Sequence, residues 1–582
     1  GETKRELLNK EKGTGEIGAD FETAIGLAGV GKFNYFLMFI CGSVFANAAI
    51  GIASISFVLP SAQCDFQLSS EDKGRLSASP NIGMLIGCCI WGLIADAKGR
   101  KWMMVAGLLL DAISSFASSL AQSYWLFIIF RFFNGFGITA ASTLVFAYLG
   151  EFLPSSKRDR MLCWLELFWS FGVVILPGMA WLVIPQTWSY TTSGGGFTFN
   201  SWRFFVALCG VPSVINACFL CALPETPKFL MSKNKLDEAY MVFQKIHRYN
   251  RGKKHEYEVK ALQAAEIISK PSKNGSVNSV GMSDVAIKDS ETAVPRQKRS
   301  RFVRAICNVI SQTKALFKPP HLRSTMITFT VQVGLMSRAV QNDCICVEVS
   351  YYTLILWFPD LFDRFERFQT LYPNRTASIC EVTAAVAKQG GVESLPCGSD
   401  GQPIVPEKVF INALYVGLAC IPSSIWLAVC VDRLGKKLIL AISLVTAGAC
   451  TLGFNFVWNS TQNLILSCIF EALTGMAISA LLCVVVELFP TNLRKHIEIF
   501  FKLLSIDFES YHHFFHLSLY DRAFALSLSL TIGRIGAITG NVAFGRLIDF
   551  NCIIPLVVGG VSLIGSGLLC LAIPKVNQNL PM

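Results

Sequence analysis

Five ionisable residues lie inside long apolar runs, where a charge needs a specific reason. They are Asp111, Arg131, Glu166, Glu471 and Arg534. At the centre of a membrane helix an Asp or Arg costs about 2.5 to 3.5 kcal/mol on insertion scales, so it usually faces a cavity or a partner side chain. Contact with a substrate or proton is one interpretation, and hydrogen bonding between helices is the other. For Asp111, Glu166 and Glu471 we favour structural pairing.

Aromatic side chains lie near these charges in the sequence. Trp164, Phe168, Trp169 and Trp357 could line a cavity and hold an organic ion by cation–π contact. Most tryptophans in membrane proteins pack or mark the interface, which is the alternative. The candidate substrate cavity is therefore lined by Asp111, Arg131, Trp164, Trp169, Trp357 and Arg534.

Two charged motifs occur twice at the same spacing. The first reads Gly92-Leu-Ile-Ala-Asp96-Ala-Lys-Gly99-Arg100-Lys101 and reappears as Asp432-Arg-Leu-Gly435-Lys436-Lys437. The second reads Glu151-Phe-Leu-Pro154-Ser-Ser-Lys-Arg158 and reappears as Glu487-Leu-Phe-Pro490-Thr-Asn-Leu-Arg494. Both copies lie 336 residues downstream (432 − 96 and 487 − 151). The common offset indicates a duplicated half, as in a large class of transporters.

The first motif suggests a gate on the cytosolic side. We expect Gly92 to let two helices approach closely, and Asp96 with Arg100 and Lys101 to form ion pairs or cap a helix end. The second copy assigns the same role to Asp432, Gly435 and Lys436. A solvated turn with basic residues is the alternative, and it explains one copy better than two. The other motif pair, Glu151, Arg158, Glu487 and Arg494, is predicted to form a cytosolic network.

These motifs lie between apolar runs of about 20 residues, long enough to cross a membrane as helices. The chain is 52% hydrophobic and 16% charged, against about 25% charged residues in soluble domains. We therefore predict an all-α membrane protein with twelve transmembrane helices in two six-helix bundles. The predicted spans are 33–58, 77–95, 102–121, 124–148, 161–184, 203–223, 326–360, 408–430, 438–457, 463–486, 523–547 and 552–573.

The predicted organisation follows from these spans. A cytosolic tail (1–32) precedes the first bundle (33–223), and a cytosolic basic loop (224–325) leads to the second bundle (326–574) and a cytosolic tail (575–582). The second bundle includes a non-cytosolic loop (361–407) and a cytosolic insertion (495–522). Both termini are thus expected in the cytosol, in a multi-pass protein of the plasma membrane or an intracellular vesicle membrane.

The net charge of +11 is concentrated in one loop. Residues 224–325 contain 20 Lys and Arg against 9 Asp and Glu, which accounts for the whole excess. Such a loop beside membrane helices is first a topology signal, and Arg296–Arg301 could also touch anionic lipid. We expect no nucleic acid partner. Within the loop, 236–260 has helical periodicity, whereas 270–300 is expected to be disordered.

Two segments interrupt the pattern. The charged residues of 338–349 would lie inside helix 7, so we expect this piece to leave the membrane as a loop or to break the helix. The segment 495–522 splits a cytosolic turn and holds four of the seven histidines. We expect no metal site at His512, His513 and His516, and no cofactor is predicted. There is also no phosphate loop, catalytic carboxylate pair or nucleophile with a base, so an enzyme is not expected.

Further motifs give the chain a family resemblance. The Gly-x-x-x-Asp-x-x-Gly-Arg-Lys turn between helices 2 and 3 resembles the signature of the major facilitator superfamily. Four segments narrow the resemblance to the synaptic vesicle glycoprotein 2 family and its organic-ion and sugar-porter relatives: Arg131–Gly137, Pro224–Leu230, Tyr351–Pro359 and Ser529–Arg534. The resemblance implies a two-bundle transporter with alternating access around a central cavity. It also puts Arg131 and Arg534 at positions where the superfamily commonly has a basic residue.

The resemblance leaves two functions open. Helix 1 of the family typically has an acidic pair where this chain reads Ala46–Gly51, and helix 10 has Trp and Asp where it reads Ile478–Cys483. A proton-coupled cycle needs a protonatable group in the cavity. One hypothesis is transport of a small organic solute, with possible proton or ion coupling. The other is a vesicle-membrane binding or trafficking protein on a transporter scaffold with little or no transport.

The non-cytosolic loop yields a prediction. It contains the sequon Asn374-Arg-Thr376 together with Cys380 and Cys397, so we expect a glycan on Asn374 and a disulfide between the two cysteines. The mass shift on deglycosylation should vanish in Asn374→Gln. An unchanged shift would assign the glycan to Asn459 or reverse the topology.

Overall fold

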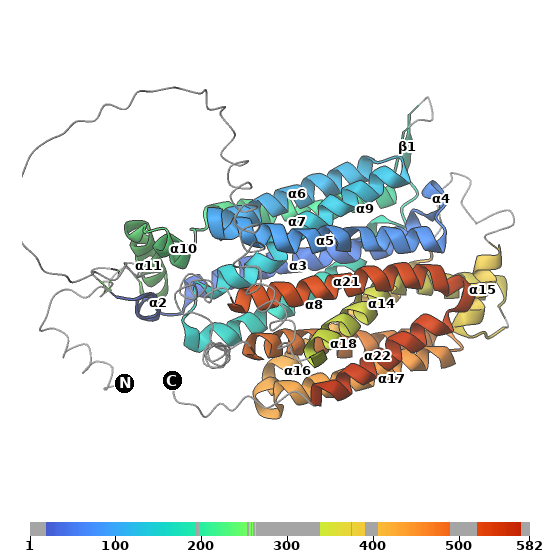
Figure 1. Cartoon of the computed structure of the whole chain (residues 1–582). Coiled ribbons are helices and arrows are strands. Elements are labelled where there is room, and N and C mark those ends of the chain that lie inside the picture. Colours follow the sequence, from blue (N-terminus) through green and yellow to red (C-terminus); the bar gives the residue numbers. More distant parts are fainter. Residues whose placement is uncertain are drawn as a thin grey trace, which may run out of the picture.

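The computed structural model describes residues 19–192, 197–252, 255, 257, 259, 262, 338–373, 375–389, 405–488 and 521–571. Twelve long helices dominate this part of the chain, six in each half (Figure 1). The first half contributes α3 (Lys32–Ser61), α5 (Ser70–Lys98), α6 (Arg100–Leu120), α7 (Tyr124–Gly150), α8 (Ser155–Val183) and α9 (Ser201–Ala222). The second contributes α14 (Arg338–Leu371), α16 (Glu407–Leu434), α17 (Lys436–Gly453), α18 (Ser460–Leu488), α21 (Asp521–Asn551) and α22 (Ile553–Leu571).

Each predicted span falls on one of these helices. By length and apolar composition alone, nine helices within the described ranges could cross a membrane. The predicted twelve-helix, two-bundle fold is confirmed. The molecule has two ends (Figure 1). At the α11 end lie α10 (Pro227–Ser232) and α11 (Leu236–Arg251). At the α15 end lies α15 (Ile379–Gln389).

The duplicated motif forms the same turn in both halves. Gly99 separates α5 from α6 with φ +102°, and Gly435 separates α16 from α17 with φ +82°. Left-handed backbone of this kind strains any residue with a Cβ, so a glycine ends one helix and starts the next. Gly92 does not have its expected role, because no described atom lies within 4 Å of its Cβ position.

The two bundles meet along three helix pairs: α5 packs on α21, α8 on α16 and α3 on α14. Near the α15 end, α5 and α21 cross at Gly74 and Gly545. A Cβ at Gly545 would lie 2.6 Å from the Ser70 carbonyl oxygen, and one at Gly74 would lie 2.8 Å from that of Asn541. Two glycines therefore let backbones of different bundles touch.

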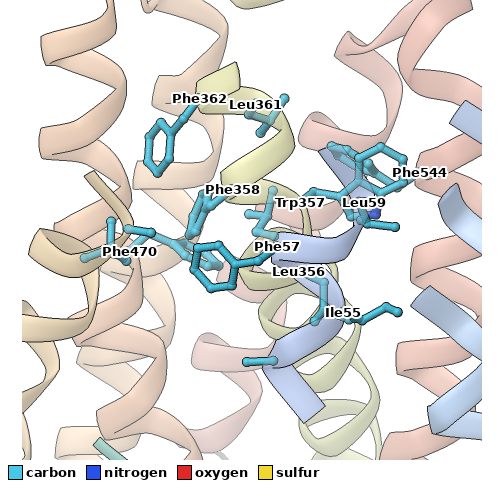
Figure 2. Packing of buried hydrophobic residues seen from close by; sticks show 14 of the residues in the cluster. Ile55, Phe57, Leu59, Leu356, Trp357, Phe358, Leu361, Phe362, Phe470 and Phe544 are labelled. Carbon is cyan, nitrogen blue, oxygen red and sulfur yellow. The ribbon is translucent and has the colours of Figure 1, made fainter. Parts of the chain in front are cut away.

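An apolar cluster, the apolar seal, joins both bundles towards the α15 end (Figure 2). Phe57 of α3 stacks on Phe410 of α16 at 6.1 Å between ring centroids, and Trp357 of α14 packs against Phe544 of α21 at 5.1 Å. A second apolar cluster, around the α11 end, does not join the two bundles through its described members. Its described members are all residues between Ala24 and Leu262, so they come from the first half and the segments attached to it.

The N-terminal segment is more structured than the predicted tail. Helix α2 (Phe21–Ala28) packs on α11, where Phe21 lies 6.0 Å from Phe243 and the Tyr257 hydroxyl donates to the Ala24 carbonyl oxygen at 2.7 Å. The helix predicted within 236–260 is present as α11 and ends at Gly252. Its apolar face provides the surface that orders α2.

Helix 7 differs from the sequence prediction at both ends. Residues 338–349 belong to α14, so the expectation of a loop or break there is wrong, and the helix passes Pro359 and continues to Leu371. At 1.5 Å per residue its 34 residues span about 51 Å, against a hydrocarbon core of about 30 Å. Such a helix can keep charged residues at both ends outside the core. The second interruption, 495–522, lies outside the described residues except for Asp521 and Arg522, where α21 begins.

The predicted disulfide between Cys380 and Cys397 is also wrong in its pairing. Cys380 of α15 is bonded to Cys552, which lies between α21 and α22, with Cα atoms 5.4 Å apart. The bond joins residues 172 positions apart, so sequence proximity was a poor guide. Cys64 at the same end is disulfide-bonded as well. Asn374 and Cys397 lie outside the described residues, and the glycosylation of Asn374 stays a prediction.

Peptide mapping under non-reducing conditions should recover a peptide pair that contains Cys380 and Cys552. The Cys552→Ser variant should lose this pair and unfold at a lower temperature, because the bond closes a long loop. Free Cys450, half-buried in the apolar helix α17, offers a control, and Cys450→Ser should leave the map unchanged. Recovery of Cys380 bonded to Cys397 would contradict the structure.

Candidate functional site

The predicted gate turn is held inside the first half. Arg100 Nη1 lies 2.7 Å from Glu151 Oε1. The Glu225 carboxylate accepts from the backbone N–H groups of Arg100 and Lys101 at 3.2 Å each, at the first turn of α6. Lys101 Nζ donates to the carbonyl oxygens of Cys221 and Leu223 at 2.9 and 2.6 Å. The turn is therefore tied to the end of α9.

Glu151 connects the two sequence motifs. It is buried between α7 and α8, and burial raises the pKa of its carboxyl group while the Arg100 charge opposes that rise. Arg158 donates to the carbonyl oxygens of Gly150 and Leu153 and to Glu22 of α2. Glu151 and Arg158 thus bind different partners, and the cytosolic network predicted for this half stays a prediction.

The second copy of these motifs is described mainly through its backbone. Gly435 forms the turn, whereas the side chains of Asp96, Asp432, Lys436 and Glu487 and the whole of Arg494 lie outside the described residues. The gate role of both aspartates stays a prediction.

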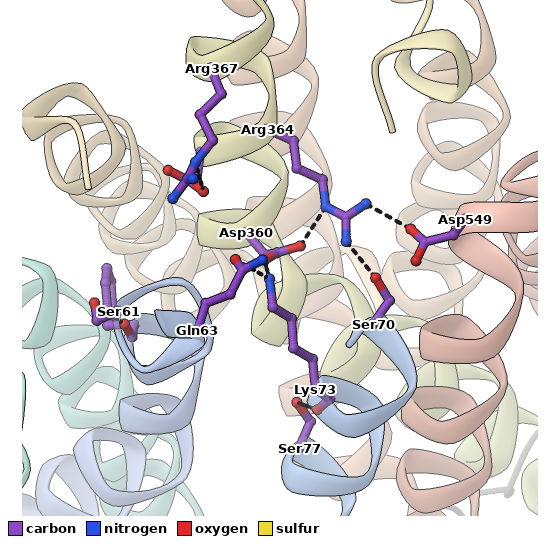
Figure 3. Close-up of polar contacts among 11 residues, drawn as sticks. Ser61, Gln63, Ser70, Lys73, Ser77, Asp360, Arg364, Arg367 and Asp549 are labelled. Carbon is purple, nitrogen blue, oxygen red and sulfur yellow. Dashed lines mark hydrogen bonds and ion pairs between the residues drawn. The ribbon is translucent and has the colours of Figure 1, made fainter. Parts of the chain in front are cut away.

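A buried ion cluster joins the bundles at the α15 end (Figure 3). This interbundle ion cluster consists of Lys73 (α5), Asp360 and Arg364 (α14), and Asp549 (α21). Lys73 Nζ donates to Asp360 and, at 3.0 Å, to Gln63. Arg364 donates to Asp360 at 2.8 Å, to Asp549 at 2.9 Å and to the Ser70 hydroxyl at 2.8 Å.

The burial of this cluster makes its pairing important. Asp360 is 0% exposed, Lys73 3% and Arg364 5%. Buried charges must be paired and hydrogen-bonded, because each loses its hydration. Here one carboxylate faces two cations contributed by both halves. Separation of the bundles would therefore break every contact between Lys73 and Asp360.

A second cluster lies where the bundles meet between the two ends. This central aromatic cluster consists of Trp169 (α8), Tyr351 and Tyr352 (α14), Glu471 (α18) and Arg534 (α21). Trp169 Nε1 donates to the Tyr351 hydroxyl at 3.2 Å across the interface. The Arg534 guanidinium lies over the Tyr352 ring at 4.6 Å. Both tyrosines belong to one buried apolar cluster with residues of α3, α5 and α7.

The six predicted cavity residues do not form one group. Trp169 and Arg534 belong to the central aromatic cluster. Asp111 and Arg131 are buried within the first bundle, where Asp111 accepts from Asn134 and Ser213 and Arg131 donates to Ser118.

The two remaining tryptophans lie in different surroundings. Trp357 belongs to the apolar seal (Figure 2), and Trp164 is 36% exposed. The hydrogen bonds of Asp111 agree with the structural pairing favoured from the sequence, and the substrate role of the predicted cavity residues stays a prediction.

Sequence reasoning missed the interbundle ion cluster and the central tyrosines. A signal for the former was present, since Asp360 and Arg364 are four residues apart, as are Asp363 and Arg367, and such pairs face each other on a helix. It was overlooked because helix 7 was predicted to end at Pro359. Tyr351 and Tyr352 were noticed only as part of a family motif.

Comparisons with known proteins agree with this architecture. Residues 32–280 match the family described as "Sugar (and other) transporter". Synaptic vesicle glycoprotein 2B of Mus musculus is 25% identical over 649 residues, which cover 97% of this chain and 87% of that protein. Synaptic vesicle glycoprotein 2A of Rattus norvegicus is 32% identical over 60% of this chain and 45% of that protein.

The fold is also found among solved structures. The xylose transporter XylE from E. coli, in a partially occluded inward open conformation, has a TM-score of 0.57 and 15% identity. The match covers 94% of this chain and 100% of that one. At this identity the likeness shows the fold alone.

The interbundle ion cluster yields a test of stability. Asp360→Asn leaves Lys73 and Arg364 buried without their shared charge partner, so it should lower the free energy of unfolding by about 3 to 5 kcal/mol. Glu71→Gln is the matched control, because Glu71 of α5 pairs with Arg546 of α21 at 3.0 Å, also between the bundles but on the surface. That variant should unfold like the wild type. Thermal unfolding of the purified protein in detergent measures both, and equal shifts would contradict the argument.

Proposed function

The chain is a major facilitator superfamily protein similar to the synaptic vesicle glycoprotein 2 proteins, and from this premise we propose that it moves a small organic solute across a membrane by alternating access. The observation that carries the proposal is the set of side-chain contacts that join the two bundles at the α15 end. Side chains from both halves close the α15 end through the interbundle ion cluster and the apolar seal. At the α11 end, the described contacts of the gate turn include those to Glu151, Glu225 and Cys221 of the first half.

These contacts at the α15 end support a motion in which one bundle rocks against the other. Side-chain contacts can break and re-form, whereas each bundle is held together internally by long helices and close packing. A state closed at the α15 end is one of the two states that such a cycle needs.

The central aromatic cluster is the proposed solute site. Trp169, Tyr351 and Tyr352 offer aromatic faces, and Glu471 and Arg534 offer one group of each charge sign. Aromatic faces hold organic cations and the apolar faces of sugars, and charged groups fix orientation. An organic ion or a sugar-like molecule fits this chemistry.

The disulfide supports the proposed orientation. Disulfides persist in oxidising compartments, and Cys380–Cys552 lies at the α15 end. That end would then face the lumen of a vesicle or the cell exterior, with both termini in the cytosol. The basic loop 224–325, which follows α9, supports the same orientation, because basic loops between membrane helices stay in the cytosol.

A second function is favoured by one observation. The stretches Ala46–Gly51 and Ile478–Cys483 contain no carboxylate. A protein without a coupling group at these positions could bind partners in a vesicle membrane and move no solute. Transport measurements distinguish the two functions.

The experiment is uptake or exchange by purified protein in proteoliposomes, with a panel of radiolabelled sugars and organic ions. In Trp169→Ala, loss of the ring should remove about 1 to 2 kcal/mol of aromatic contact with the solute. Apparent binding of the solute should therefore weaken roughly 5- to 30-fold. Trp164→Ala, on the same helix but 36% exposed, is the matched control and should transport like the wild type. Asp96→Asn and Asp432→Asn should slow the cycle without preventing insertion.

Two results would count against transport. If the protein bound one of the solutes but moved none of them, the binding function would replace the proposed transport function. Equal loss in Trp169→Ala and Trp164→Ala would remove the central cluster as the solute site.

A further inference from the structure

Glu471 is buried in an unusual way for a carboxylate. It lies in α18 with 0% exposure, and neither carboxylate oxygen has a hydrogen-bond partner. The groups that face it are the Tyr351 hydroxyl from α14, the Cys420 thiol from α16 and Cys468 of α18 itself. The hydroxyl and the thiol lie close without reaching hydrogen-bond geometry. None of these neighbours is a cation.

The sequence of the helices around it offers no other partner at this depth. Residues 409–431 of α16 and 438–453 of α17 contain no Asp, Glu, His, Lys or Arg. The arginines of α21 are Arg522, Arg534 and Arg546, and the guanidinium of Arg534 lies over the Tyr352 ring at 4.6 Å. Glu471 therefore contrasts with Asp360, which is equally buried but bonded to both Lys73 and Arg364.

A carboxylate that is fully buried beside a phenol and thiols loses its hydration and receives no compensating charge. We propose that Glu471 is a proton-binding site, occupied in the state that this structure describes. The carboxylate takes a proton from hydronium, which forms the O–H bond and releases water. The neutral acid can stay buried, and its O–H group can donate to the Tyr351 hydroxyl once either side chain turns slightly.

The position of Glu471 ties this proton to the bundle interface. Its neighbour Tyr351 accepts a hydrogen bond from Trp169, which belongs to the other bundle. If the bundles part as proposed for transport, this bond breaks and water can reach the carboxyl group, which then releases its proton. Glu471 would thus supply the protonatable group absent from Ala46–Gly51 and Ile478–Cys483. This role rests on the proposed function, whereas proton binding does not.

The test uses an apolar carbodiimide on the full-length protein in detergent at neutral pH. A protonated carboxyl group adds its O–H across one C=N bond of dicyclohexylcarbodiimide, and the acyl group then moves to nitrogen to give a stable N-acylurea that retains all atoms of both reactants. Mass spectrometry of peptides should find the adduct at Glu471 at least about tenfold more often than at the ion-paired Asp360. Glu471→Gln should abolish it.

Thermal unfolding provides a second readout that needs no reagent. Glutamine mimics the neutral acid, so Glu471→Gln should unfold at the wild-type temperature, in contrast to Asp360→Asn. Absence of the adduct at Glu471, equal modification of both acids, or a fall in Tm on Glu471→Gln would each overturn the proposal. Solute uptake is not part of either readout. If the adduct forms at Glu471 but the protein moves no solute, the proposed transport function is wrong and the proton-binding site still stands.

Discussion

The ion pair between Lys73 and Asp360 is the contact on which the arrangement of the two bundles depends. Charges this deeply buried are tolerated only when they are paired, so α5 and α14 must stay in register wherever both residues are shielded from water. Arg364 extends the constraint to α21 through Asp549. The glycine contact between α5 and α21 lies beside this cluster, and the apolar seal also joins the two bundles towards the same end. Polar, apolar and backbone contacts thus agree on one closed end.

At the α11 end, the described contacts of the gate turn to Glu225 and Glu151 lie within the first half. There, Glu225 and Glu151 hold the turn after α5 by bonding backbone N–H groups and a guanidinium of the same half. Gly99 is the single residue between α5 and α6, and Gly435 is the single residue between α16 and α17. A turn fixed within its own half moves with that half as a rigid unit. These described contacts lie within one half, so they can persist when the bundles separate.

The sequence predicts the local features of this molecule and misses those that depend on distant partners. Apolar runs locate all twelve helices, because a membrane helix must satisfy its own backbone, and the 336-residue offset identifies both glycine turns. The extent of α14 was missed because Pro359 resembles a helix end, yet neighbouring helices can accommodate a proline inside a membrane helix. The pairing of Cys380 with Cys552 and of Lys73 with Asp360 joins residues far apart in sequence, 172 positions in the case of the disulfide. No local pattern specifies such partners. Of the residues in the proposed solute site, the sequence analysis placed Trp169 and Arg534 in its candidate cavity.

Asp360 and Glu471 show how one membrane protein can use buried carboxylates in opposite ways. A buried ion pair gains little over its hydrated state, since the attraction between the charges mainly offsets the lost hydration. Opening the α15 end would return Asp360 and Lys73 to water, so this cluster specifies the register of the closed end while allowing it to open. Most of the closing free energy must then come from the apolar seal, which loses its burial when the bundles part. Glu471 has no such counter-charge, and hydration of its carboxylate would favour the open state. Under the proposed cycle, the closed end is favoured when Glu471 is protonated and opposed when it is ionised, which couples a proton to the position of the bundles without any direct contact between Glu471 and the gate.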